Sequence, residues 1–171
     1  MKIGVLKETY PGEQRVALVP SVVPSLIKGG MEVIIESRAG EQAGYPDSAY
    51  VEKGGKIADS REQVFQMVDC ILQVRLLGAN LHEGKADLPG FRKGQMLVGI
   101  AEALSHPQSV QDLAAREVTS FALELMPRIT RAQSMDILSS MGTVAGYKAV
   151  VMAANTLPKM FPMLMTAAGT V

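Results

Sequence analysis

The sequence has little of several residue types, and each scarcity excludes a class of protein. Its 171 residues include no tryptophan and a single cysteine, Cys70, so no disulfide can form within one chain. Seventeen basic residues balance seventeen acidic ones. No dense Lys/Arg run occurs, so the charge pattern of a nucleic-acid-binding protein is missing. With 47% hydrophobic residues the chain can bury a sizeable core, as one domain or as one domain and the beginning of another.

Long uninterrupted apolar runs are also missing. The N-terminal run ends at Lys7 and Glu8, which is too short for a secretory signal. The apolar stretch over residues 149–171 is interrupted by polar residues and prolines, among them Asn155 and Pro158, short of the ~20 residues that a transmembrane helix needs. We therefore expect the chain to be soluble by itself.

Short β-branched or apolar runs alternate with helical patterns, which is typical of an α/β domain with a largely parallel sheet. Cys70 falls in such a run, where a buried strand thiol is expected rather than a reactive one. The predicted strands are residues 2–6, 31–36, 70–75, 94–100 and 118–123, and the predicted helices are residues 20–30, 60–67, 107–116 and a long helix from about residue 136.

Two capping boxes mark helix starts in this pattern. Ser60 is followed by Gln63, and Ser105 by Gln108, each at the spacing in which two side chains bind free amides at a helix N-terminus. A loop rich in turn-forming residues is predicted over residues 37–47.

The glycines and histidines do not form known ligand motifs. No G-x-G-x-x-G or G-x-x-x-x-G-K-[ST] sequence occurs, so no phosphate-binding loop is predicted. Gly142 and Gly146 lie four apart on the predicted long helix, which favours close packing against another helix. His82, His106 and Cys70 lack zinc-ligand spacing, so no metal site is predicted.

Ligands of open α/β sheets bind beyond the carboxyl ends of the strands, and the loop after the first strand occupies such a position. There, Lys7 and Glu13 individually resemble charges of a solvated turn. Arg15 lies where the chain re-enters the core, and Arg75 ends a strand. Two interpretations stay open: the two guanidinium groups converge to bind an anion, or each forms a structural ion pair.

The second loop of this kind contains "RITRAQSMD", Arg128–Asp136. In one interpretation Asp136 or Ser139 caps the long helix and the other side chains are solvated. In the other, the carboxamide of Gln133 binds an amide-bearing ring such as nicotinamide, and Arg128 and Asp136 hold Gln133 by flanking hydrogen bonds. The residues alone favour the second only weakly.

Three stretches resemble a known family: "KIGVLKETYPGEQRVALVP", "MPRITRAQSMDILSSMGTVAGYKAV" and "MTAAGTV". They are similar to the alpha subunit of the proton-translocating NAD(P) transhydrogenase, its NAD(H)-binding component, which is related to alanine dehydrogenase. The resemblance implies a Rossmann-like α/β fold, with a parallel sheet flanked by helices.

The resemblance also implies roles for the second loop, which in the family contacts the nicotinamide part of NAD(H) close to where hydride passes to NADP(H) on a partner subunit. Arg128, Gln133 and Asp136 would act in hydride transfer. The implied cofactor-binding residues are Arg128, Ile129, Gln133, Asp136 and Ser139.

Departures from the pattern distinguish the two relatives. Alanine dehydrogenase is similar in using an arginine, a lysine and a histidine to process a 2-oxo acid. Arg15 matches the arginine, but Arg75 stands at the lysine position and Glu102 at the histidine position. Hydride exchange between two nicotinamides needs no acid or base, so the missing imidazole fits transhydrogenase.

The resemblance further implies that the family's chain continues beyond this sequence into a Gly-rich dinucleotide-binding domain. We expect residues 1–135 to form the first segment of an N-terminal domain, and residues 136–171 to form a connecting helix and the start of the NAD-binding domain. The main NAD(H) site would then lie outside this chain, and the isolated chain would be inactive.

The implied partners are a second copy in a homodimer and the membrane-embedded and NADP-binding subunits, with no nucleic acid. The implied location is the cytoplasm, at the inner membrane through those subunits. Two alternatives stay open: a non-catalytic truncated domain that serves as a folding or assembly module, and an alanine dehydrogenase-like 2-oxo acid oxidoreductase.

Overall fold

The computed structural model describes residues 1–159, 165–166 and 169–170. The chain divides into two compact units, Met1–Met126 and Pro127–Val171, and each is described by itself. The boundary predicted from the sequence, at residue 135, falls within the second unit and stays a prediction.

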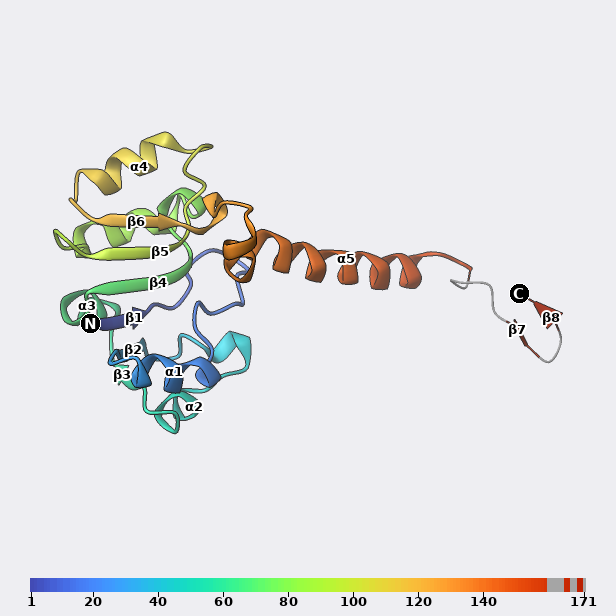
Figure 1. Cartoon of the computed structure of the whole chain (residues 1–171), viewed down its shortest axis with the longest axis horizontal. Helices are drawn as coiled ribbons and strands as arrows, with labels where there is room; N and C mark the ends of the chain where they lie inside the picture. The colour runs from blue at the N-terminus through green and yellow to red at the C-terminus, as the bar shows by residue number, and fades with distance from the viewer. Residues whose placement is uncertain (160–164, 167–168, 171) are drawn as a thin grey trace. The chain divides into compact units, whose positions relative to one another are not determined.

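The first unit is built on a six-stranded sheet with the order β3-β2-β1-β4-β5-β6, in which every neighbouring pair is parallel (Figure 1). The predicted Rossmann-like α/β class is therefore confirmed. The third strand had not been predicted. The strands are β1 Lys2–Val5, β2 Glu32–Glu36, β3 Lys56–Ala58, β4 Cys70–Arg75, β5 Met96–Ile100 and β6 Thr119–Ala122.

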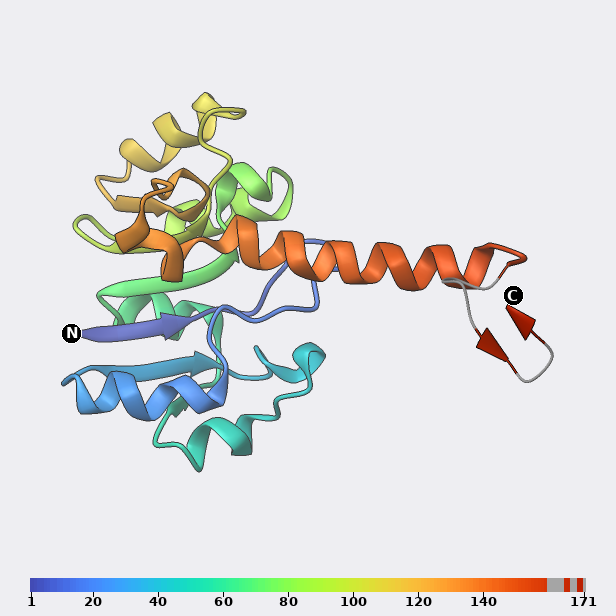
Figure 2. The ribbon, with the colours of Figure 1, turned by 45° about the vertical axis from the view of Figure 1, so that its right-hand side comes forward.

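Helices connect the strands of this sheet, and Figure 2 shows β1 and β2 running in the same direction with α1 alongside. A short helix, α2, lies where only a loop and an unassigned segment were expected. The helices are α1 Val23–Lys28, α2 Asp47–Val51, α3 Arg61–Met67 and α4 Pro107–Ala114, with 3₁₀ turns η1 Pro20–Val22, η2 Glu41–Ala43, η3 Leu77–Ala79, η4 Glu83–Gly90 and η5 Leu123–Leu125.

The start of α3 follows the predicted cap. Ser60 Oγ accepts a hydrogen bond from the Gln63 amide at 3.3 Å. The Gln63 side chain accepts from the amide of Asp59 at 3.0 Å, one residue earlier than in a standard capping box. Ser60 and Gln63 thus satisfy two amides at this helix end.

The capping box predicted for α4 is wrong. The residue at the N-cap is His106, and no side chain caps this end. Gln108 instead donates a side-chain hydrogen bond to Asp112 at 3.0 Å, one turn further along the helix. Pro107 at the first helical position lacks an N–H, so one of the free amides of the helix end does not arise.

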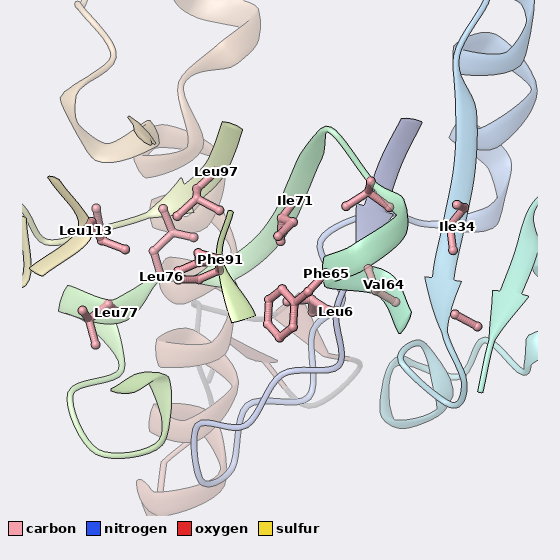
Figure 3. Close-up of a cluster of buried hydrophobic side chains, with 13 residues drawn as sticks. Leu6, Ile34, Val64, Phe65, Ile71, Leu76, Leu77, Phe91, Leu97 and Leu113 are labelled. Carbon is pink, nitrogen blue, oxygen red and sulfur yellow. The ribbon is translucent and has the colours of Figure 1, made fainter. Parts of the chain in front are cut away.

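Two clusters of buried side chains hold the helices to the sheet. The larger joins β-strand residues to α3, α4 and the turns η3 and η4, with Phe65 and Phe91 in an edge-to-face contact at 5.4 Å (Figure 3). The smaller surrounds Tyr50 of α2 and Val23 of α1. Cys70 is buried, as predicted, and burial raises the pKa of its thiol.

The second unit contains a 3₁₀ turn, η6 Thr130–Met135, and a long helix, α5 Ile137–Thr156. The helix begins where the sequence predicted. Asp136 is its N-cap, and the carboxylate accepts hydrogen bonds from the amides of Leu138 and Ser139, both at 3.0 Å, and from Ser139 Oγ at 2.7 Å. Figures 1 and 2 show α5 as one uninterrupted helix.

By length and composition α5 could cross a membrane, with a mean hydropathy of 1.3. Core helices of soluble proteins meet the same criterion, so this observation alone decides nothing. The helix reaches this length because it starts at Ile137, before the apolar stretch over residues 149–171 that was considered from the sequence. Most of its residues are exposed in the structure.

The two glycines of α5 do not pack as the sequence suggested. A Cβ atom built on Gly142 or Gly146 would meet nothing within 4 Å. Close helix packing at these positions is therefore absent among the residues that the structure describes. Beyond α5, the strands β7 Met165–Thr166 and β8 Gly169–Thr170 pair antiparallel. The extended segment predicted at residues 166–171 lies partly outside the described residues.

We expect Asp136→Ala to fray the first turn of α5, because the first amides of the helix lose their acceptor. Far-UV circular dichroism should show a lower helical content than in the unchanged chain. Asp136→Asn is the matched control, because asparagine caps as well as aspartate. Equal helicity in Asp136→Ala and Asp136→Asn would contradict the cap.

Candidate functional site

The strand order reverses direction at β1, whose neighbours are β2 and β4. In open α/β sheets the crevice beyond the carboxyl ends of two such central strands is where ligands bind. In this chain it is bordered by the loop after β1, residues 6–15, and by the end of β4 at Arg75.

Glu13 lies at the centre of this crevice and binds both predicted arginines. Arg15 Nε donates to Glu13 Oε1 at 2.7 Å, and a terminal nitrogen of Arg15 donates to Oε2 at 2.6 Å. Arg75 Nε donates to the same Oε2 at 2.9 Å. Glu13 is only 8% exposed, so the interpretation of this residue as a charge of a solvated turn is wrong.

The two open interpretations for Arg15 and Arg75 are therefore both partly right. The guanidinium groups converge, and the anion between them is the chain's own carboxylate. The guanidinium of Arg75 also lies over the Tyr10 ring, 4.3 Å from its centroid, in a cation–π contact. Bidentate pairing of the kind seen at Arg15 is about twice as strong as a neutral hydrogen bond.

Glu8, from the same loop, had not been singled out in the sequence. Its carboxylate accepts hydrogen bonds from the amides of Val74 at 2.6 Å and Arg75 at 3.2 Å, which joins the loop after β1 to the last residues of β4. The only signal in the sequence was its place directly after the first strand, at the carboxyl edge of the sheet.

The two carboxylates have opposite pKa shifts. The hydrogen bonds from Arg15 lower the pKa of Glu13 to about 2, against a partial opposing effect of burial. Burial raises the pKa of Glu8, although the amides of Val74 and Arg75 oppose the change. Since the pKa of Glu13 falls on folding, its ionised form stabilises the fold at neutral pH. This contribution is lost as the pH falls from the ordinary value of 4.5 towards 2.

A second buried network, also missed in the sequence, lies beside the crevice. Arg61, at the start of α3, binds Asp87 through two hydrogen bonds of 2.6 Å and donates to Glu36 at 2.9 Å. Glu36 also accepts from the backbone amide of Lys7 at 2.8 Å. Each charge is paired, so we assign the network a structural role.

The predicted nicotinamide loop, residues 128–136, belongs to the second unit, whereas Arg15, Arg75 and Glu102 belong to the first. Arg128, Ile129 and Gln133 are exposed. Among the residues that the structure describes, the side chains of Arg128 and Gln133 form no hydrogen bond.

The flanking hydrogen bonds predicted from Arg128 and Asp136 to Gln133 are thus not present. Asp136 is instead occupied by Ser139 and the first amides of α5, and the hydrogen bonds from Ser139 lower the pKa of Asp136. The capping interpretation is confirmed for Asp136. It leaves a guanidinium and a carboxamide with unused hydrogen-bonding capacity next to a rigid helix start.

Comparison with known proteins identifies relatives of the chain. A family model described as "Alanine dehydrogenase/PNT, N-terminal domain" matches residues 4–145. The chain is 43% identical over 171 residues to the first of the separate polypeptides of NAD(P) transhydrogenase subunit alpha in Rhodospirillum rubrum, covering 100% of this chain and 44% of that protein. It is 30% identical over 159 residues to an alanine dehydrogenase of Methanococcus maripaludis, covering 93% of this chain and 40% of that protein.

Solved structures give the same pair of relatives. The chain is similar to a transhydrogenase from Sinorhizobium meliloti, with a TM-score of 0.87 at 37% identity, covering 100% of this chain and 49% of that one. It is also similar to an L-alanine dehydrogenase, with a TM-score of 0.80 at 28% identity, covering 91% of this chain and 40% of that one. This chain therefore spans less than half the length of these relatives, and it belongs to the family of alanine dehydrogenase and transhydrogenase N-terminal domains.

Proposed function

We propose that this chain is part of the NAD(H)-binding component of a proton-translocating NAD(P) transhydrogenase, and that residues 128–139 contact the nicotinamide end of NAD(H). The observation that carries the proposal is the exposed, unused Gln133 carboxamide beside the fixed N-cap of α5. The 43% identity to a transhydrogenase subunit over the whole chain supports it.

The roles of the loop residues follow from their contacts. Asp136 fixes the start of α5 through Leu138 and Ser139, so the residues just before it are held at a defined helix end. From there Gln133 can donate to and accept from the nicotinamide carboxamide, and Arg128 and Ile129 can contact the rest of the nucleotide. The cofactor supplies the hydride, and the protein supplies its position.

The crevice of the first unit suits a structural role better than a nucleotide pyrophosphate site. A pyrophosphate is normally bound by successive amides at a Gly-rich turn that opens a helix. The loop after β1 has no such turn, and the carboxylate of Glu13 occupies its two arginines. We therefore place the main NAD(H) site outside this chain, and expect the isolated chain to be inactive.

The partners follow from the same proposal. NADP(H) would bind a partner subunit, and the chain would act in a homodimer together with membrane-embedded subunits. It would lie in the cytoplasm, at the inner membrane through those subunits. The name of these relatives, subunit alpha, supports other subunits in the assembly.

The first test is Gln133→Ala in a complete transhydrogenase subunit that contains this segment, assembled with its partners. We expect hydride transfer in single-turnover kinetics to slow by ~10-fold or more, because a misplaced reactant loses the advantage of proximity. Ser134→Ala, an exposed neighbour in the same turn, is the control and should keep the original rate. Equal rates in the two variants would refute the role of Gln133.

The alternative function is that of an alanine dehydrogenase, favoured by the relatives of 28–31% identity and by Arg15. We expect no NAD-dependent formation of pyruvate from L-alanine by the complete protein. Glu102 stands where that relative has its histidine, and a carboxylate ionised at neutral pH is a poor proton donor. Spectrophotometry of NADH formation with alanine and NAD is the measurement, and sustained formation of NADH would favour the alternative.

A further inference from the structure

The loop between β5 and α4, residues 101–106, has an unusual backbone that the proposed function does not explain. Glu102 has φ = +47°, a left-handed conformation that non-glycine residues rarely adopt. Such strain persists only where the surrounding structure imposes it, and it is concentrated at functional sites.

Glu124, from η5, imposes this conformation. One of its carboxylate oxygens accepts a hydrogen bond from the Ala101 amide at 3.0 Å, and the other accepts from the Ala103 amide at 3.1 Å. The two amides flank Glu102, so a single charged group fixes the backbone on both sides of the strained residue. Charge-assisted bonds of this kind are stronger than neutral ones.

The opposite side of the loop is fixed by packing. A Cβ atom on Gly78 would lie 1.8 Å from the Ala101 carbonyl oxygen, so only glycine permits this approach. Ala101 and Ala103 line an apolar cavity of about 290 Å³ beside α4, and Glu102 does not. The loop therefore turns its two alanines towards the apolar cavity and keeps Glu102 out of it.

The backbone of Glu102 also fixes the residue that begins α4. The amides of Ser105 and His106 both donate to the Glu102 carbonyl oxygen, at 3.1 Å and 2.9 Å. This turn places His106 Nδ1 3.4 Å from a carboxylate oxygen of Glu102. The separation is within ion-pair distance, but its geometry is not that of a hydrogen bond, and Nδ1 is buried with no other partner among the described residues.

We propose that Glu102 and His106 form an acid–base pair that Glu124 positions. Two acceptors facing each other would repel, so a neutral His106 facing the Glu102 carboxylate carries its proton on Nδ1. The lone pair is then on Nε2, at the other side of a ring whose side chain is 34% exposed. A carboxylate that orients an imidazole in this way prepares Nε2 to accept a proton from a ligand.

The chemistry of Nε2 defines the class of ligand. A neutral imidazole with a free Nε2 lone pair accepts a hydrogen bond from a hydroxyl group or a water molecule. If the proton moves to Nε2, the resulting imidazolium is stabilised by Glu102, and the ligand keeps the electron pair as an alkoxide or hydroxide. The inference is independent of the proposed NAD(H) role, because none of these residues belongs to residues 128–139.

The test is the tautomer of His106, read from long-range ¹H–¹⁵N NMR spectra of the full 171-residue chain at a pH where the ring is neutral. We expect the Nδ1–H form for His106. Exposed His82 in the same molecule serves as the internal reference and should show the Nε2–H form that an unconstrained imidazole prefers.

Two variants separate the carboxylate from the loop that positions it. Glu102→Gly removes the carboxylate and tolerates a positive φ, so the loop should persist while His106 reverts to Nε2–H. Glu124→Gln replaces the shared acceptor, and should shift the Ala101 and Ala103 amide signals together with the tautomer. Glu117→Gln, an exposed glutamate that also has a positive φ, is the matched control and should change neither.

A second readout keeps the test independent of assignment of the ring nitrogens. Diethyl pyrocarbonate, which reacts with a free imidazole lone pair, should modify His106 severalfold faster in the original chain than in Glu102→Gly, with His82 unchanged. An unchanged tautomer in Glu102→Gly would overturn the pair. A changed tautomer in Glu102→Gly but not in Glu124→Gln would overturn the positioning role of Glu124.

Discussion

The shared carboxylate of Glu13 is the interaction on which the centre of the first unit depends. It joins Arg15, in the loop after β1, to Arg75 at the end of β4, across the two strands where the sheet reverses direction. Removal of one partner from a buried, paired charge leaves the other uncompensated, so the group acts as a unit. Because its positive charges are neutralised from within, the crevice keeps its shape without a bound anion.

The second unit depends on a different carboxylate, that of Asp136. It fixes the beginning of α5, and the polar residues before it are presented at that helix end. The helix itself is apolar all round and mostly exposed. Helices of this composition are normally buried. This agrees with a chain that spans less than half the length of its relatives and supports the view that α5 packs against protein outside this sequence.

Periodic patterns predicted the elements that carry strong local signals. β2 is a buried run of β-branched residues, and α5 starts at an N-cap aspartate. β3 has only three residues, and Ser105 satisfied a capping pattern although Pro107 had already removed a free amide, so both predictions failed for lack of a distinguishing local signal. Residues 128–136 were found from their polar composition. Glu13 could not be, since its burial depends on Arg75, far away in the sequence.

The measurement that tests the central claim most directly is a titration of the 171-residue chain with NADH, followed by NMR and calorimetry. The account predicts weak binding, with shifts concentrated on residues 128–139. A few hydrogen bonds worth ~1 kcal/mol each must still overcome the entropic cost of association. Shifts confined to the crevice around Glu13, or a micromolar dissociation constant, would contradict a nicotinamide-contacting loop whose main nucleotide site lies elsewhere.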